Sequence, residues 1–402
     1  MLDLETAIAL DGSRPRLSTD FDLPDDVVYL DGNSLGAMPQ QARARARRVI
    51  EDEWAVGLIR SWNDSDWVSL ARRVGDRIGA LVGAEPGTVI ACDSTSINLY
   101  KAVSSAMSHA GAPKVMLTDS ANFPSDLYVL GTIAAERGWE LRTVAPDRVV
   151  DALADGISVL AVTQVDYRSG RRHDMEAVTR RASELGVVTV WDLAHSAGAF
   201  DVRLDGCGVD YAVGCGYKFL NGGPGAPAFI YVSAERLASI SNPITGWFGH
   251  QRPFDFDPEF RPAEGIDRMR VGTSHVISLS VLDAALDVFD GVDLDEVWNR
   301  GSELVSHLLD GFDSLGLDVI TPRESAGRGS QASFRHPQAY AIVQALIDRG
   351  VIGDFRAPDI ARFGVAPLYV SHRDIATALG QLSDVLDIDD LDSHGGRRGE
   401  VT

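Results

Sequence analysis

The sequence predicts an α/β protein with a large domain built on a mostly parallel central sheet, followed by a smaller α+β C-terminal domain. Between residues 87 and 232, short apolar runs alternate with helical segments, and this alternation is typical of a parallel sheet covered on both faces. Beyond residue 290, short strands and helices follow one another in a different order. The length of 402 residues suits about two domains.

The N-terminal region is expected to be an extended arm over residues 20–38, followed by a helix over residues 40–59 for which Pro39 precedes the first turn. A second helix is expected over residues 68–82. The strands predicted for the large domain are TVIACD (88–93), KVMLTD (114–119), ISVLAVTQV (157–165), VVTVWD (187–192), DYAVGC (210–215) and APAFIYV (226–232). The helices predicted between them cover residues 94–107, 123–138 and 173–186.

The stretch over residues 241–274 is rich in Pro, Gly, Phe and Arg and has no clear period, which is typical of a binding or interface loop. The later elements are expected to be helices over 275–290, 295–312 and 339–350, strands over 317–322, 331–336, 351–356 and 361–367, and a final helix. The domain boundaries that follow are 1–50 for an N-terminal arm and helix packing on the small domain, 51–290 for the large ligand-binding domain, 291–388 for the small domain and 389–402 for a disordered tail.

Composition excludes several classes of function. The net charge of −21 argues against nucleic acid or an anionic membrane as the main partner. Cys92, Cys207 and Cys215 form no CxxC pair, so we expect neither a disulfide framework nor a metal site. The first twenty residues do not resemble a secretory signal, and no apolar run has the length of a membrane span. The expected location is the cytoplasm.

Only three lysines occur in the chain, which narrows the choice of a reactive amine. Lys218 lies in GCGYKFLNGGPGAP (214–227), where glycines let the backbone approach a ligand closely. Lys101 and Lys114 fit ordinary surface lysines better. We therefore expect Lys218 to be the functional amine.

Asp192 follows the apolar run VVTVW, so its carboxylate should be buried and in need of a partner. A lysine just beyond the next strand completes the layout that pyridoxal phosphate requires. The lysine forms a Schiff base with the cofactor aldehyde, and the aspartate keeps the pyridine nitrogen protonated. Asp192 could instead cap the following LAHSAG turn. His195, three residues later, is either a cofactor neighbour or a structural histidine.

A phosphate group needs hydroxyls and backbone N–H groups at the start of a helix. Ser94, Thr95 and Ser96 provide three hydroxyls at the junction of a predicted strand and a predicted helix, whereas capping alone would explain one. Phe123 could lie over a flat ring, although a core position is its ordinary interpretation.

The Asp192, Lys218 and Ser94–Ser96 segments, together with several others, resemble those of the kynureninase family, whose members are fold type I enzymes that depend on pyridoxal phosphate. The pairing of WDLAHSAG with YKFLNGGPGAP is specific within that fold, and YLDGNSLG with GWFGH narrows it to this family. The matching stretches span nearly the whole chain: YLDGNSLG (29–36), DSTSINLYK (93–101), FPSDLY (123–128), WDLAHSAGA (191–199), GYKFLNGGPGAPAF (216–229), GWFGH (246–250), RVGT (270–273) and RFGVAPLY (362–369).

The resemblance implies a role for each matched residue. Lys218 would form the Schiff base, and Arg362 would bind the substrate α-carboxylate, a task that suits a guanidinium. Tyr217 would contact the phosphate and assist proton transfer. The other implied cofactor contacts are Thr95, Ser96, Phe123, Asp126, Thr163, Asp192 and His195, together with Trp247 and Thr273 reaching the cofactor of a neighbouring subunit in a homodimer.

The activity implied by the resemblance is the hydrolysis of L-kynurenine, and of its 3-hydroxy form as a second candidate, to anthranilate or 3-hydroxyanthranilate and L-alanine. After RVGT the family often continues with prolines, whereas this chain has Ser274 and His275. His275 is therefore either a substrate contact or a helix-start residue, and the choice between the two substrates stays open.

Three other functions compete with this one. A cysteine desulfurase-like lyase needs a nucleophilic cysteine late in the chain, and no cysteine follows Cys215. An aminotransferase uses the same lysine, aspartate and arginine. A protein that binds the cofactor without catalysis is disfavoured by the intact Lys218, Asp192 and Arg362.

Overall fold

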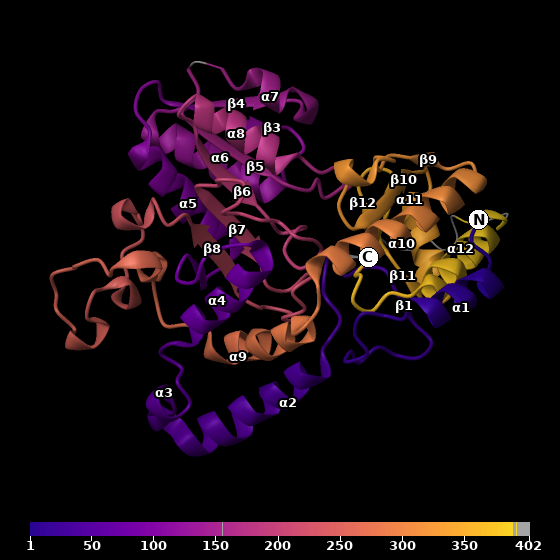
Figure 1. The fold of residues 1–402 in the computed structure, drawn as a ribbon, viewed down its shortest axis with the longest axis horizontal. Coiled ribbons are helices and arrows are strands. Elements are labelled where there is room, and N and C mark those ends of the chain that lie inside the picture. The colour runs from indigo at the N-terminus through magenta and orange to yellow at the C-terminus, as the bar shows by residue number, and fades with distance from the viewer. Residues whose placement is uncertain (155, 389–390, 392–402) are drawn as a thin grey trace.

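The computed structural model describes residues 1–154, 156–388 and 391, and in this part of the chain two domains lie side by side (Figure 1). The large domain contains a seven-stranded sheet of order β2-β8-β7-β6-β5-β3-β4. Strand β8 (Ala228–Val232) is antiparallel to both of its neighbours, and every other neighbouring pair is parallel. The mostly parallel sheet that the sequence predicts is therefore confirmed.

Burial explains why these strands are readable in the sequence. Every residue of β2 (Val89–Ala91), β3 (Val115–Asp119), β5 (Val159–Thr163), β6 (Val188–Asp192), β7 (Tyr211–Cys215) and β8 is buried. Strands covered on both faces read as continuous apolar runs. The edge strand β4 (Glu140–Val144), with the polar sequence ELRTV and mostly exposed residues, was not predicted for the same reason.

Five helices of the large domain lie where the sequence predicts them: α4 (Leu70–Val82), α5 (Thr95–His109), α6 (Pro124–Arg137), α8 (Met175–Glu184) and α9 (Val276–Ala285). Helix α9 packs against α2 and α4, and the short α7 (Val149–Ala152), which contacts β3, was not predicted. Helix α5 contacts β5, β6, β7 and β8, so its N-terminus lies near the ends of the central strands. Within residues 241–274 the helical structure consists of short 3₁₀ turns, as the irregular composition predicts.

The small domain contains a four-stranded antiparallel sheet of order β12-β13-β10-β9. Its strands are β9 (Asp318–Val319), β10 (Gln331–Arg335), β12 (Asp354–Arg356) and β13 (Ile360–Gly364), and its helices are α10 (Leu294–Ser314), α11 (Ala339–Ile347) and α12 (His372–Leu386). Phe312 of α10 packs against Phe334 of β10 and Phe363 of β13, and the three buried rings form the aromatic centre of this domain.

The N-terminal region joins both domains. Helix α1 (Leu4–Ser13), which was not predicted, packs against α12, and β1 (Val28–Tyr29) pairs with β11 (Val351–Ile352) of the small domain (Figure 1). Helix α2 (Gln40–Arg48) packs instead against α9 of the large domain. A π-helix over Val49–Gly57, a 3₁₀ turn over Leu58–Arg60 and α3 (Ser61–Asp64) continue α2. The helix predicted over residues 40–59 is thus confirmed as far as Gly57, with a wider turn over its second half, and Leu58 at φ 55° interrupts it.

Two remaining expectations concern the ends and the membrane. The tail predicted over residues 389–402 lies, apart from Leu391, outside the described residues. Among the helices of the described part, none combines the length and the apolar character that crossing a bilayer requires.

Candidate active site

A cavity of about 870 Å³ lies at the ends of the central strands and is lined by residues of both domains. Thr163 ends β5, Asp192 ends β6 and Lys218 follows β7, so three neighbouring strands deliver one side chain each. Thr163 and Asp192 are directly paired in the sheet register. Ligands in open α/β sheets bind at this edge, so the sheet topology itself brings these distant residues together.

Lys218 lies inside this cavity, where burial lowers the pKa of its ammonium group. Its Nζ atom is 6.0 Å from the ring centroid of Phe123 and 5.8 Å from that of Tyr217. Asp192 opposes the effect of burial by favouring the charged form. A lowered pKa increases the fraction of neutral amine, which is the form that attacks an aldehyde.

The carboxyl group of Asp192 is buried and forms a side-chain hydrogen bond with that of Asp126. Burial raises the pKa of both groups, and the charge of Asp192 raises the pKa of Asp126 further. Two close carboxyls retain a shared proton. Asp192 Oδ1 also accepts the N–H of Ala194 at 2.8 Å, so the turn-stabilising alternative holds together with the cavity position.

The prediction that Lys101 is an ordinary surface lysine is wrong. Its side chain is fully buried, not exposed, and its Nζ donates to Asp93 Oδ2 at 2.6 Å and to the carbonyl oxygen of Met269 at 2.7 Å. Helix α5 contacts four strands, so even a lysine on it can be enclosed. Lys101 does not line the cavity, whereas Lys114 is exposed as predicted.

The N-terminus of α5 faces the cavity. Ser94 is the N-cap residue, and its Oγ accepts the N–H of Ile97 at 3.5 Å. Thr95 and Ser96 also line the cavity. Since the first N–H groups of a helix have no partner within the helix, these hydroxyls and amides form a group of donors suited to an anion.

His195 is buried and lines the same cavity, and its Nδ1 is 3.4 Å from Oε1 of Gln331. Burial, with the positive charges of Lys218 and Arg362, holds the pKa of His195 well below its usual range. The imidazole is therefore neutral at physiological pH. It can contact a neutral ring without introducing another positive charge.

On the small-domain side, Arg362 is 1% exposed and forms a bidentate ion pair with Asp354. Nε donates to Asp354 Oδ1 at 2.7 Å, and Nη2 donates to Asp354 Oδ2 and, at 2.7 Å, to Ser34 Oγ. Nη1 donates to the carbonyl oxygen of Tyr167 at 2.6 Å. These contacts occupy four of the five N–H groups and fix the plane of the guanidinium.

Several cavity residues were not identified from the sequence. Arg356 lines the cavity and donates to Ser34 Oγ at 3.1 Å and to Asp354. Asp31 does not line the cavity but lies close to Asp354, and burial together with the charge of Asp354 raises the pKa of Asp31 to about 7. The pairing of β12 with β13 sets Asp354 opposite Arg362, and the alternation in DFR puts Arg356 on the same face. That alternation was the available signal. The remaining unpredicted lining residues include Asn33, Ser34 and Tyr167.

Of three further residues predicted for the site, one lines the cavity and two do not. His275 lines the cavity at the start of α9 and makes no side-chain capping bond, so both of its interpretations stay open. Trp247 packs among Phe248, Phe254 and Phe256 and does not line the cavity of its own chain. Thr273 is exposed and is also absent from that lining.

Comparison with known proteins decides the family. Residues 297–382 match the kynureninase C-terminal domain. The chain is 47% identical over 398 residues to a kynureninase of Deinococcus radiodurans, covering 96% of this chain and 97% of the relative. This chain belongs to the kynureninase family. A second kynureninase, from Pseudomonas fluorescens, is 44% identical over 94% of each chain.

Solved structures agree with the kynureninase fold. The chain superposes on a cystine C–S lyase with a TM-score of 0.79 at 19% identity, covering 90% of this chain and 98% of the lyase. It superposes on the cysteine desulfurase of Thermococcus onnurineus with a TM-score of 0.78 at 18% identity, covering 96% and 98% of the two chains. The fold is thus that of the fold type I enzymes, as the resemblance implied.

Proposed function

We propose that this chain hydrolyses the Cβ–Cγ bond of L-kynurenine to give anthranilate and L-alanine, with pyridoxal phosphate as its cofactor. The observation that carries the proposal is the combination of Lys218, Asp192 and Arg362 around one cavity in a member of the kynureninase family. These three side chains line the same cavity although Arg362 comes from the small domain and the other two from the large domain.

The residues present fit the cofactor. Asp192 is a buried carboxylate whose raised pKa reflects a need for a cationic N–H partner, and a protonated pyridine nitrogen is one. Thr95, Ser96 and the start of α5 offer hydroxyl and amide donors to a phosphate. Phe123, partly exposed at the cavity, offers a flat apolar face, and His195 and Thr163 are placed to complete the enclosure. The volume of about 870 Å³ is in the range of sites that hold small-molecule ligands.

When bound, pyridoxal phosphate supplies an aldehyde that condenses with amines and a protonated ring that accepts an electron pair. Lys218 would hold the aldehyde, and its amine would also be placed to accept the proton of the substrate Cα. Asp192 keeps the proton on the ring nitrogen, and Asp126 supports it through their hydrogen bond. Burial raises the pKa of Tyr217, so its hydroxyl stays protonated and is a proton donor to the substrate Cβ.

The substrate is oriented from the small-domain side. Arg362 presents its guanidinium in a plane fixed by Asp354, which suits recognition of the α-carboxylate. Its contacts with Ser34 and Tyr167 are then the ones that the substrate carboxylate displaces or shares. His275 lines the same cavity from α9 and is a candidate contact for the aromatic end of the substrate.

The test uses purified protein loaded with pyridoxal phosphate and supplied with L-kynurenine. Anthranilate fluorescence should appear without any added keto acid, and L-alanine should form in equal amount. A strict requirement for a keto acid would replace the hydrolase with an aminotransferase, and absence of product would refute the proposal. Parallel reactions with 3-hydroxykynurenine, in the wild type and in His275→Ala, measure the substrate preference.

We also propose that the chain acts as a homodimer with shared active sites. Trp54, Val56, Leu58 and Ile59 are large apolar side chains exposed on the continuation of α2, and Ile277 of α9 lines a shallow apolar hollow together with Trp54. Exposed apolar side chains in such number on one segment are typical of a subunit interface. Trp247 and Thr273 lie outside the cavity of their own chain, and a second subunit is what would give them a cofactor to contact.

Sedimentation of wild type and of Ile59→Glu measures the dimer directly. The wild type should sediment as a dimer and the variant as a monomer, because a charge in place of the exposed Ile59 opposes burial of this segment in an interface. A monomeric wild type that is fully active would contradict the shared site.

The expected cytoplasmic location remains part of this proposal. Cys92, Cys207 and Cys215 are free thiols, which suits a reducing compartment.

A further inference from the structure

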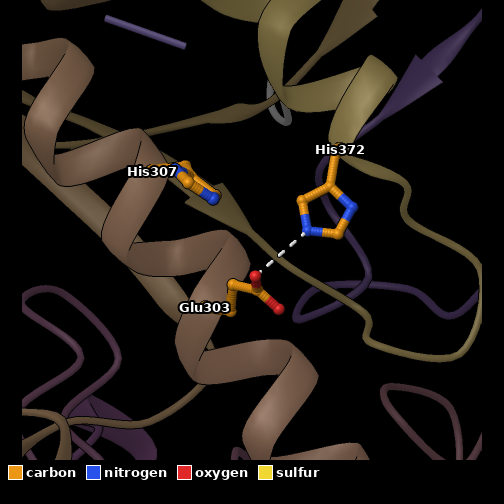
Figure 2. A group of neighbouring side chains, drawn as sticks. All are labelled: Glu303, His307 and His372. Carbon is orange, nitrogen blue, oxygen red and sulfur yellow. Dashed lines mark ion pairs between the residues drawn. The ribbon is translucent and has the colours of Figure 1, made fainter. Parts of the chain in front are cut away.

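Two histidines and a glutamate converge in the small domain, away from the active-site cavity. Glu303 and His307 lie one turn apart on α10, and His372 is the first residue of α12 (Figure 2). Each offers one ligand atom, and these atoms all lie within 4.8 Å of one another. Figure 2 shows the three side chains directed toward a common point between the two helices.

The two nitrogens of His372 have different surroundings. Nδ1 is 2.9 Å from Asp11 Oδ1, and the backbone N–H groups of His372 and Arg373 also donate to that carboxylate, at 2.9 and 3.0 Å. A carboxylate held in this way accepts the Nδ1 proton and sets the tautomer, which leaves a lone pair on Nε2. The side chain of His372 is 0% exposed, so water cannot easily serve that nitrogen.

Nε2 of His372 has no hydrogen-bond partner among the described residues. It points toward Glu303, whose Oε1 is 3.6 Å away. Two acceptors that face each other across a buried gap repel unless a cation lies between them. A metal ion between Nε2 and Glu303 Oε1 would accept a lone pair from each of them.

We infer that Glu303, His307 and His372 bind a divalent transition-metal ion, with Zn²⁺ the ion that suits the donors best. Two imidazoles and one carboxylate form a borderline donor set that favours Zn²⁺ over Mg²⁺ or Ca²⁺, which prefer oxygen alone. Asp11, bonded to the far nitrogen of His372, is the outer carboxylate that commonly orients such a ligand. This assignment replaces the expectation of no metal site, which was based on cysteine spacing alone.

The required adjustment is small. Donor atoms in a tetrahedral zinc site lie about 3.4 Å apart, given bond lengths of about 2.0–2.2 Å. The separation of 3.6 Å between His372 Nε2 and Glu303 Oε1 is already close to that value. His307 must then move its ring nitrogen closer to the other two donor atoms. Its side chain is only half-buried on the surface of α10, so the ring has room to rotate.

Arg14 competes for the same glutamate. Its Nη1 lies 2.5 Å from Glu303 Oε1, but 60% of the Arg14 side chain is exposed, so it can move into solvent when a metal binds. Arg300 is the other nearby cation, 3.8 Å from Asp11, and it is held by the carbonyl oxygens of Arg14 and Val370. Arg14 should therefore act as a competitor and Arg300 as a fixed part of the surroundings.

The site would join three segments that are far apart in the sequence. Asp11 lies on α1, Glu303 and His307 on α10, and His372 on α12. A metal bound only in the folded state stabilises it by mass action. The inferred role is structural: the ion fastens the N-terminal helix and the start of α12 to α10, and it takes no part in the reaction.

The test uses the full-length protein loaded with pyridoxal phosphate and treated with a chelator. Titration with Zn²⁺ by calorimetry, and with Co²⁺ by visible absorption, should give one ion per chain, a tetrahedral cobalt spectrum and a higher melting temperature. His307→Gln should abolish this binding. His336→Gln, at another half-buried histidine outside the cluster, should bind as the wild type does.

Two further variants change the charged neighbours of the cluster and should shift its metal affinity in opposite directions. Asp11→Asn should weaken binding about 10- to 100-fold, as loss of an outer carboxylate commonly does, whereas Arg14→Ala should strengthen it by removing the competing cation. Absence of Zn²⁺ and Co²⁺ binding in the wild type, or binding that His307→Gln leaves unchanged, would overturn the inference. Cofactor absorbance should be the same in all of these variants, so a loss of metal binding is not a loss of the active site.

Discussion

On the large-domain side of the cavity, Lys218, Asp192 and Thr163 each end or follow a buried strand, whereas on the small-domain side Arg362 and Asp354 face each other across antiparallel strands. The first group depends on sheet topology, which places successive strand ends at one edge. The second depends on one register and on contacts such as that from Ser34 to Arg362, 328 residues apart in the sequence. On the large-domain side, burial lowers the pKa of Lys218 and raises that of Asp192. On the small-domain side, hydrogen bonds fix the position of one cation, the guanidinium of Arg362.

The largest effect on turnover should come from the large-domain side. Asp192→Asn should reduce kcat on the order of 10²- to 10⁴-fold, because an amide cannot keep a proton on the cofactor ring. Steady-state kinetics with L-kynurenine measure this loss. Asp126→Asn is the matched comparison: its amide still donates to Asp192, so its loss should be much smaller. Equal losses in the two variants would show that Asp192 has no special role.

The small-domain side should respond through stability and binding together. Arg362→Met removes the bidentate partner of the buried Asp354 and leaves it only Arg356 and Ser34, which should cost up to about 3–5 kcal/mol of folding free energy. It should also raise KM strongly through loss of the α-carboxylate contact. Denaturant unfolding and kinetics measure the two effects.

A second substitution separates these effects. Arg362→Met combined with Asp354→Asn also removes the buried carboxylate that has lost its bidentate partner, and the partly exposed Arg356 can turn to solvent, so part of the stability should return while KM stays high. A double variant with a normal KM would exclude Arg362 from substrate binding.

A further effect concerns pH. Burial and Asp354 raise the pKa of Asp31 to about 7, from about 4 in an unfolded chain. Between these values the folded state binds more protons than the unfolded state, so this residue makes stability fall as pH rises. Asp31→Asn should flatten the decline between about pH 4 and pH 7 in unfolding experiments. An unchanged pH profile would contradict the raised pKa.

The same comparison explains what the sequence could predict. The buried strands, the Gly-rich Lys218 turn and the α5 hydroxyls are local signals, and the structure places them around one cavity. Asp31, Ser34 and Arg356 could not be identified, because their role depends on an N-terminal arm that lies against the small domain. Lys101 was misread because its burial depends on the sheet beneath α5 and not on its neighbours in the sequence.

The chain's three lysines allow a direct test of the central claim, that Lys218 is the amine that carries the cofactor. Protein loaded with pyridoxal phosphate is reduced with borohydride, digested and mapped by mass spectrometry. A pyridoxyl group on the peptide that contains Lys218, and none on those with Lys101 or Lys114, is the predicted result. Modification confined to Lys101 or Lys114, or no stable modification at all, would contradict the account.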